Sequence, residues 1–157
     1  DPGVVVSLVG PLMSGDADFA KGHYRRNTGP GGLGGGRVTE LTAKPLLRRF
    51  MPHLDAFAQP LSGEYAGLRS VLERLPFEPG WGVDLGLLAD VVDLAGIDRV
   101  AAVDLGERHH SHRPLAELAP QADAVVGVIL DRCGLRSSSE VALPPIAGLP
   151  QRAQEAG

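Results

Sequence analysis

The chain has 157 residues, 43% of them hydrophobic and 22% charged, a composition typical of one globular domain with a single core. Its net charge of −4 argues against general binding to nucleic acid or to an anionic membrane surface. A single cysteine, Cys133, permits no internal disulfide, and the longest apolar run is too short to span a bilayer. We therefore expect a cytoplasmic location. Because the chain starts at Asp1 inside an apolar segment, we expect a fragment of a longer protein.

The first segments alternate with turns of small residues. Residues 4–9 (VVVSLV) fit either a buried strand or a buried helical turn, since so short an apolar run has no distinguishing periodicity. Residues 16–18 lie in a turn, and residues 19–26 are predicted as a strand with a basic end. That end fits either a solvated strand edge or a ligand contact.

Residues 34–41 (GGGRVTEL) are the most distinctive stretch. Glycines let a backbone approach a ligand closely, and the apolar run that follows is predicted as a helix. A helix N-terminus with free N–H groups suits an anion, to which Arg37 can add a guanidinium fork and Thr39 a hydroxyl. A glycine-rich surface loop capped by Thr39 fits equally well. The stretch is neither a P-loop nor a dinucleotide-binding turn.

Apolar spacing predicts helices in the middle of the chain. The first covers residues 38–54 and becomes regular near Thr42, because Pro45 cannot lie deep in a helix. A short amphipathic helix is predicted over residues 65–75.

A longer helix is predicted over residues 83–95 and ends at Gly96. Asp84 lies in its first turn, where the helix dipole favours a carboxylate, and Asp90 is expected to face outward. The final helix runs from about Leu115 to Cys133, which is expected to be a small core residue.

Residues 100–105 (VAAVDL) are predicted as a buried strand leading directly into a histidine cluster. His109 or His110 with His112 can bind a divalent metal, whereas a polar surface loop fits the same residues. A single histidine completing a site with ligands from elsewhere is the third possibility. Residues 136–157 are expected to form a mobile tail.

Six stretches occur together in one order and with consistent spacing. They are residues 23–26 (HYRR), 34–41 (GGGRVTEL), 59–65 (QPLSGEY), 79–86 (PGWGVDLG), 103–115 (VDLGERHHSHRPL) and 132–134 (RCG). The set resembles the C-terminal half of the glucosyl-3-phosphoglycerate synthases, and the likeness covers about Val9 to Cys133.

This resemblance implies an α/β fold, the C-terminal portion of a GT-A glycosyltransferase without its N-terminal nucleotide-binding strands. Residues 1–135 would form this acceptor-binding part. The implied reaction transfers glucose from UDP-glucose to the 2-hydroxyl of D-3-phosphoglycerate with retention, using Mg²⁺ or Mn²⁺, in a homodimeric enzyme. Because the half that carries the Asp-x-Asp metal motif is missing, we expect this chain alone to be inactive.

On the acceptor side, the resemblance gives Gly36, Arg37 and Thr39 a role in binding phosphoglycerate. It places His112 near the same acceptor, at a position where asparagine is usual. It makes His110 a metal ligand, which favours the shared-site interpretation of the histidines.

On the donor side, the resemblance places Trp81 against the sugar nucleotide and Arg108 against its diphosphate. Asp84 stands where the family has a glutamate near the reacting sugar. The carboxylate is one methylene shorter here, which matters for a role that depends on placement.

Two alternatives remain at this stage. One is a related GT-A enzyme with another sugar nucleotide or acceptor; the other is a non-catalytic remnant or interaction module. For either, a sheet that lacks its first strands exposes apolar surface and an open edge, which predicts self-association of the isolated chain.

Overall fold

The computed structural model describes residues 1–26, 36–108, 114–135 and 144–148. Within this part of the chain, a mixed sheet of three strands has the order β2-β1-β3. The central strand β1 (Phe19–Arg26) runs antiparallel to β2 (Tyr65–Gly67) and parallel to β3 (Val100–Arg108). In this register Lys21 lies between Tyr65 and Ala102. The predicted α/β class and the predicted strand at residues 19–26 are confirmed.

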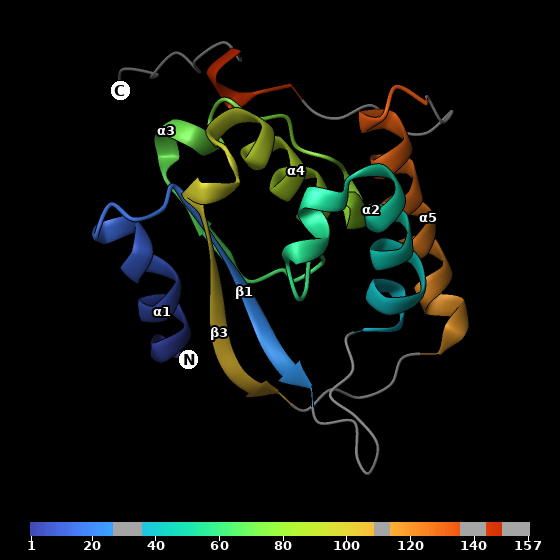
Figure 1. Cartoon of the computed structure of the whole chain (residues 1–157), viewed down its shortest axis with the longest axis horizontal. Coiled ribbons are helices and arrows are strands. Elements are labelled where there is room, and N and C mark those ends of the chain that lie inside the picture. The colour runs from blue at the N-terminus through green and yellow to red at the C-terminus, as the bar shows by residue number, and fades with distance from the viewer. Residues whose placement is uncertain (27–35, 109–113, 136–143, 149–157) are drawn as a thin grey trace, which may run out of the picture.

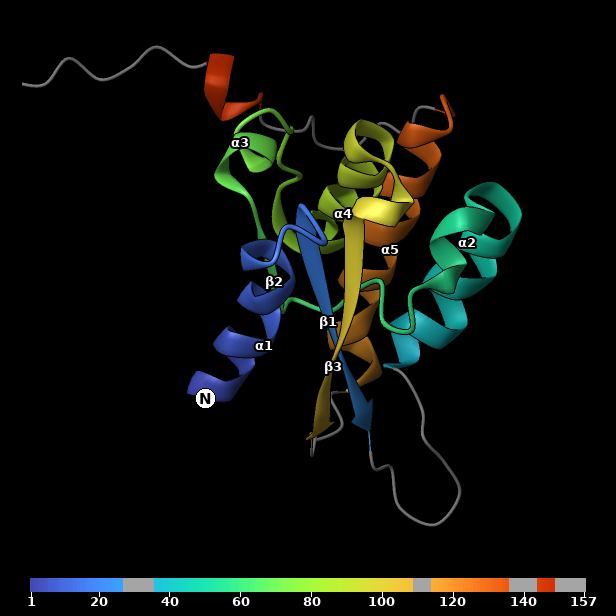
Figure 2. The same ribbon diagram turned by 60° about the vertical axis from the view of Figure 1, so that its left-hand side comes forward.

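Helices cover both faces of this sheet (Figures 1 and 2). Helix α1 (Pro2–Met13) lies on one face, whereas α4 (Val83–Ala95) and α5 (Leu115–Arg132) lie on the other, with α2 (Lys44–Phe50) beside α5. The larger core cluster joins α2, α4 and α5. A smaller cluster packs Phe19 of β1 against α4 and the turn that follows α3 (Arg69–Leu72).

Residues 4–9 are helical, and the prediction that they are buried is wrong. The Asp1 side chain accepts the Gly3 N–H at 2.8 Å and caps α1, and Pro2 occupies the first turn, where its missing N–H costs nothing. Of the residues of α1 only Leu8 is buried, while Val5 and Val6 are 61% and 71% exposed. Helix α1 therefore presents apolar side chains to solvent.

The segment after the glycines is helical but irregular from Arg37, and its regular part begins close to the predicted position near Thr42. Residues Thr39–Ala43 form a wide π-type turn, and regular α-helix begins only at Lys44. Pro45 explains the irregularity, because its ring nitrogen cannot donate to a carbonyl in the preceding turn. A 3₁₀ turn, Pro52–Ala56, closes the segment.

The helix predicted over residues 65–75 is only partly present. Its first residues form strand β2, and the helix α3 is confined to Arg69–Leu72. Pairing with β1 outweighs local helical spacing here, because the Tyr65 ring stacks on Phe19 with ring centroids 5.5 Å apart.

The later elements follow the prediction more closely. Helix α4 ends at Gly96, whose φ of +88° suits glycine, and α5 ends before Gly134, with φ +73°. Cys133 is half-buried and packs against the larger core cluster. Strand β3 is present but is not a buried strand: it lies at the edge among the described strands, and Ala102 and Asp104, which share one face of it, are exposed.

The chain has no candidate membrane span among its described residues: none of these helices combines the length and apolar content that crossing a bilayer requires. Most of the predicted tail lies outside the described residues. Its described part contains a 3₁₀ turn, Ile146–Gly148, whose Ala147 N–H donates to the Glu73 carbonyl at 2.9 Å.

Candidate functional site

A buried lysine lies where β1, β2 and the start of α4 meet. Lys21 is only 2% exposed, and its Nζ donates to the Asp84 main-chain oxygen at 3.0 Å. The same ammonium lies 5.2 Å from the centre of the Tyr65 ring, within reach of a cation–π interaction. Lys21 thus ties the central strand to the first turn of α4.

The charges around Lys21 perturb one another. Burial lowers the pKa of Lys21 to about 8, although the carboxylates of Asp84 and Glu64 favour its charged form. Burial raises the pKa of Asp84, and Glu64 adds to this effect while Lys21 opposes it. Burial and Asp84 also raise the pKa of Tyr65. One ammonium therefore interacts electrostatically with two carboxylates in a largely buried cluster.

Residues 59–65 (QPLSGEY) shape the other side of this cluster. The Ser62 hydroxyl donates to Glu64 Oε2 at 3.1 Å and accepts the Glu64 N–H at 3.3 Å. A Cβ added to Gly63 would lie 3.8 Å from Asp84 Oδ1, so this loop passes directly beside the carboxylate.

The Gln59 side chain, at the start of the same loop, forms hydrogen bonds with the main chain of β1 as a neighbouring strand would. The amide of Gln59 accepts the Tyr24 N–H at 3.2 Å and donates to the Tyr24 carbonyl. Gly22, two residues before Tyr24 on the same strand, donates its N–H to the Glu64 carbonyl at 2.8 Å. The main-chain groups of Gly22 and Tyr24, which lie past the end of the pairing with β2, thereby have hydrogen-bond partners. The register between β1 and β3 is irregular at the same place, between His23 and Arg25.

Residues 34–41, the predicted anion cradle, include the start of a helix among their described members. The Gly36 carbonyl accepts the Glu40 N–H at 2.9 Å, and the helical run begins at Arg37. Arg37 is exposed, whereas Thr39 is buried at 5% exposure. Residues 27–35, which contain the first glycines of the cradle, lie outside the described residues.

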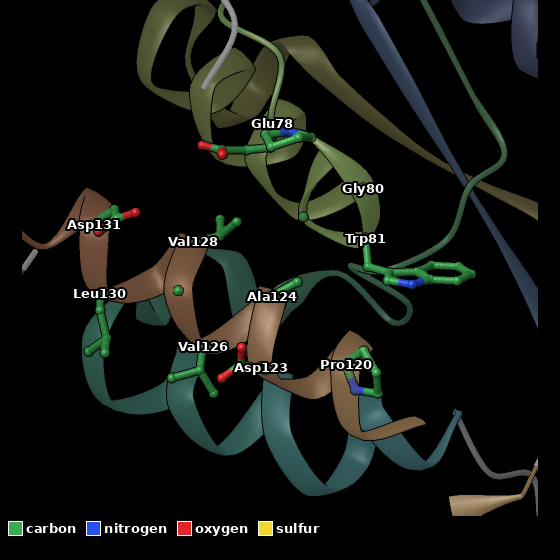
Figure 3. A pocket seen from close by; sticks show the side chains of 13 residues that line it. Glu78, Gly80, Trp81, Pro120, Asp123, Ala124, Val126, Val128, Leu130 and Asp131 are labelled. Carbon is green, nitrogen blue, oxygen red and sulfur yellow. The ribbon is translucent and has the colours of Figure 1, made fainter. Parts of the chain in front are cut away.

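Trp81 occupies a 3₁₀ turn, Gly80–Gly82, immediately before α4, and is 52% exposed. This turn and α5 border a hollow of about 660 Å³ (Figure 3). Trp81 lies at the end of the hollow that also holds Pro120, while Leu130 and Asp131 lie at the other end. The indole is thus half-exposed at one end of the hollow, three residues before Asp84 in the sequence.

An ion-pair network fixes the Trp81 turn, and it overturns the expectation that Asp90 faces outward. Arg132 of α5 donates to Asp90 through Nε at 2.8 Å and through Nη2 at 2.7 Å, and its Nη1 reaches Glu78 at 2.7 Å. These side chains are 11–15% exposed. Glycine at position 86 makes the approach possible, since a Cβ there would lie 3.0 Å from Arg132 Nη2.

The predicted diphosphate contact, Arg108, lies at the end of β3, and the predicted metal ligand, His110, follows it in the sequence. Arg108 is the last residue of β3, opposite Arg26 of β1, so the carboxyl ends of these parallel strands lie together (Figure 1). His110 and His112 fall outside the described residues. Across the described part of the chain, no three His, Cys, Asp or Glu side chains are grouped so that they could hold a metal.

Lys21 and Glu64 are site residues that sequence reasoning missed. Strand alternation contains a signal for Lys21, because it shares a face with Phe19, which is fully buried. Burying the charge of a lysine at such a position costs free energy of folding unless the ammonium has close partners. Glu64 stands in a distinctive motif, but only the fold shows that it faces Lys21.

Comparison with known proteins gives relatives along most of this chain. Glucosyl-3-phosphoglycerate synthase of Mycolicibacterium smegmatis is 48% identical over 143 residues, which are 88% of this chain and 47% of the relative. The synthase of Petrotoga mobilis is 43% identical over 83% of this chain and 42% of its own length. No family model matches the chain. The chain spans about half the length of the curated relatives it matches.

Solved structures of the same kind of synthase are similar to this chain in fold. A Mycobacterium tuberculosis synthase structure in complex with Mn²⁺, UDP-glucose and phosphoglyceric acid superposes with a TM-score of 0.83 at 43% identity, covering 93% of this chain and 55% of that one. A complex of the same enzyme with phosphoglyceric acid gives a TM-score of 0.84. The chain is thus related to a glycosyltransferase of mixed α/β fold. More narrowly, it is a homologue of glucosyl-3-phosphoglycerate synthase over about half of that enzyme's length.

Proposed function

We propose that this chain is the C-terminal, acceptor-binding part of a retaining GT-A glucosyltransferase. The complete enzyme would transfer glucose from UDP-glucose to the 2-hydroxyl of D-3-phosphoglycerate. The observation that carries the proposal is the helical start at Gly36 and Arg37, in a chain homologous to synthases solved with phosphoglyceric acid. Residues 1–135 would make up this part.

On the acceptor side, we propose that Gly36, Arg37 and Thr39 bind the phosphoglycerate. The first N–H groups of a helix have no acceptor within the helix, which favours an anion there, and the guanidinium of the exposed Arg37 can donate to two anion oxygens. The burial of Thr39 holds its side chain in a fixed place beside that start. His112 would contact the same acceptor.

On the donor side, we propose that Trp81 packs against the sugar nucleotide and that Asp84 positions the reacting glucose. A half-exposed indole directly before the first turn of α4 supports this pairing, because both residues are held by one structural unit. Arg108 would stabilise the charge that develops on the UDP leaving group. Arg108 and Asp84 are thus the proposed catalytic residues.

The proposed cofactor is Mg²⁺ or Mn²⁺, with His110 as one ligand and the others supplied from outside the described residues. Mn²⁺ in the solved relatives supports this choice. A bound divalent cation would neutralise charge on the diphosphate. We further propose a cytoplasmic homodimer for the complete enzyme.

The test is a transfer assay followed by ³¹P NMR, with UDP-glucose, Mn²⁺ and a panel of acceptors. The chain is assayed alone and together with the separately produced other half of the M. smegmatis relative. We expect a glucosylated D-3-phosphoglycerate only when both parts are present. Transfer to glycerate in preference to D-3-phosphoglycerate would instead indicate a related enzyme with another acceptor.

A further inference from the structure

Lys21 occupies a position that an apolar residue would fill at lower cost. It lies in the central strand, on the same face as the fully buried Phe19, and is itself 2% exposed. Removing an ammonium from water is costly unless close partners compensate. A buried lysine in the centre of a sheet therefore calls for a specific role.

The partners of Lys21 come from β2, from the loop that precedes β2 and from the start of α4, while β3 places the uncharged Ala102 beside it. Its Nζ donates to the Asp84 carbonyl of α4 at 3.0 Å and lies over the Tyr65 ring of β2 at 5.2 Å. The charged groups that face it are the carboxylates of Asp84 and of Glu64, which precedes β2, and Tyr65 is the other titratable group. Lys21 is thus bound to the main chain of Asp84 and attracted to its side chain.

We propose that Lys21 is a positioning residue: its buried ammonium fixes the first turn of α4 against the central strand and thereby holds the Asp84 carboxylate in place. This inference rests on the proposed function only in that Asp84 is taken to position the sugar. The geometry explains how a carboxylate on a short side chain is kept beside the loop at Gly63. The Asp84 carboxylate is then oriented, because the buried cation is held in a fixed place beside the first turn of α4.

The experiment follows the Asp84 carboxyl by ¹³C NMR titration in the folded chain. Lys21→Met removes the charge and keeps much of the side-chain volume, and Lys44→Met is the matched control on α2. We expect Lys21→Met to raise the pKa of Asp84 by about one unit, whereas Lys44→Met leaves it unchanged. Lys21→Arg, which keeps a positive charge, is expected to restore most of the shift.

The reciprocal variant protects the test against a Lys21→Met chain that does not fold. Asp84→Asn removes one of the two carboxylates that favour the charged form of Lys21, so the pKa of Lys21, followed at its Cε resonances, is expected to fall by a similar amount. An unchanged Lys21 titration in Asp84→Asn, or equal Asp84 titrations in a folded Lys21→Met chain and the parent, overturns the inference. Neither titration needs turnover or acceptor binding. A failed transfer assay would therefore count against the proposed function without deciding the role of Lys21.

Discussion

Lys21 makes the chain's stability depend on pH in an unusual direction. Its pKa is about 8 in the folded chain, below its ordinary value of 10.5, because burial disfavours the ammonium. The folded state therefore loses this proton before the unfolded state does. Between about pH 8 and pH 10.5 the unfolded chain binds more protons, so the Lys21 contribution to the free energy of unfolding rises with pH.

Denaturant unfolding of the parent chain and of Lys21→Met over this range measures the effect. From about pH 8 to about pH 9.5, the parent is expected to gain roughly 1–2 kcal/mol relative to the variant. Burial and Asp84 raise the pKa of Tyr65 above its ordinary value of 10.0 in the folded chain, so this residue contributes little in the window. Parallel stability curves would show that Lys21 does not release its proton there.

At the scale of single elements, local signals predicted most of the longer helices. Helix α4 has repeated apolar spacing and a glycine stop, and its predicted bounds, residues 83–95, are those observed. Strand β2 was missed because three residues with no alternation become a strand only by pairing with β1. Asp90 was misplaced because its partner Arg132 is distant in sequence and lies on another helix. The cradle residues stay a prediction from the glycine-rich motif and the family resemblance, whereas the Lys21 cluster depends on the tertiary fold.

The Arg132 network is expected to be the strongest polar tie between elements. Arg132→Met leaves Glu78 and Asp90 without their partner in a largely buried place, and we expect a loss of about 3–5 kcal/mol in the free energy of unfolding. Arg69→Met is the control, since it removes a pair with Glu73 on the surface of α3, where Arg69 is 88% exposed. Urea unfolding measures the loss in both variants. Equal losses would contradict the prediction that the Arg132 network stabilises the fold more than the surface pair does.

The same network holds the close contact between α4 and α5. A Cβ at position 86 would lie 2.7 Å from Glu78 Cγ as well as close to Arg132, so Gly86→Ala forces these groups apart. We expect it to cost about 1–3 kcal/mol in thermal or urea unfolding. Gly10→Ala in α1, where an added Cβ meets nothing within 4 Å, should leave stability unchanged or raise it.

At the scale of the whole molecule, one face remains apolar in the described structure. Val6 and Met13 on α1 are 71% and 81% exposed, and β3 lies at the sheet edge among the described strands. Exposed apolar faces and sheet edges favour association. Sedimentation velocity is expected to show self-association that Val6→Glu reduces. Leu115→Glu, at a similarly exposed position of 73% on α5, is the control. A monodisperse parent that melts cooperatively as a monomer would contradict this prediction.

The central claim is that the helix start after Gly36 binds the acceptor. Calorimetric titration with D-3-phosphoglycerate tests it most directly, on the parent, on Arg37→Ala and on Arg48→Ala, which removes an exposed arginine in the last turn of α2. We predict binding by the parent and by Arg48→Ala, and an affinity at least about tenfold weaker for Arg37→Ala, because a charge-assisted bidentate contact is lost. No binding by a folded parent chain, or equal binding by Arg37→Ala, would contradict the account.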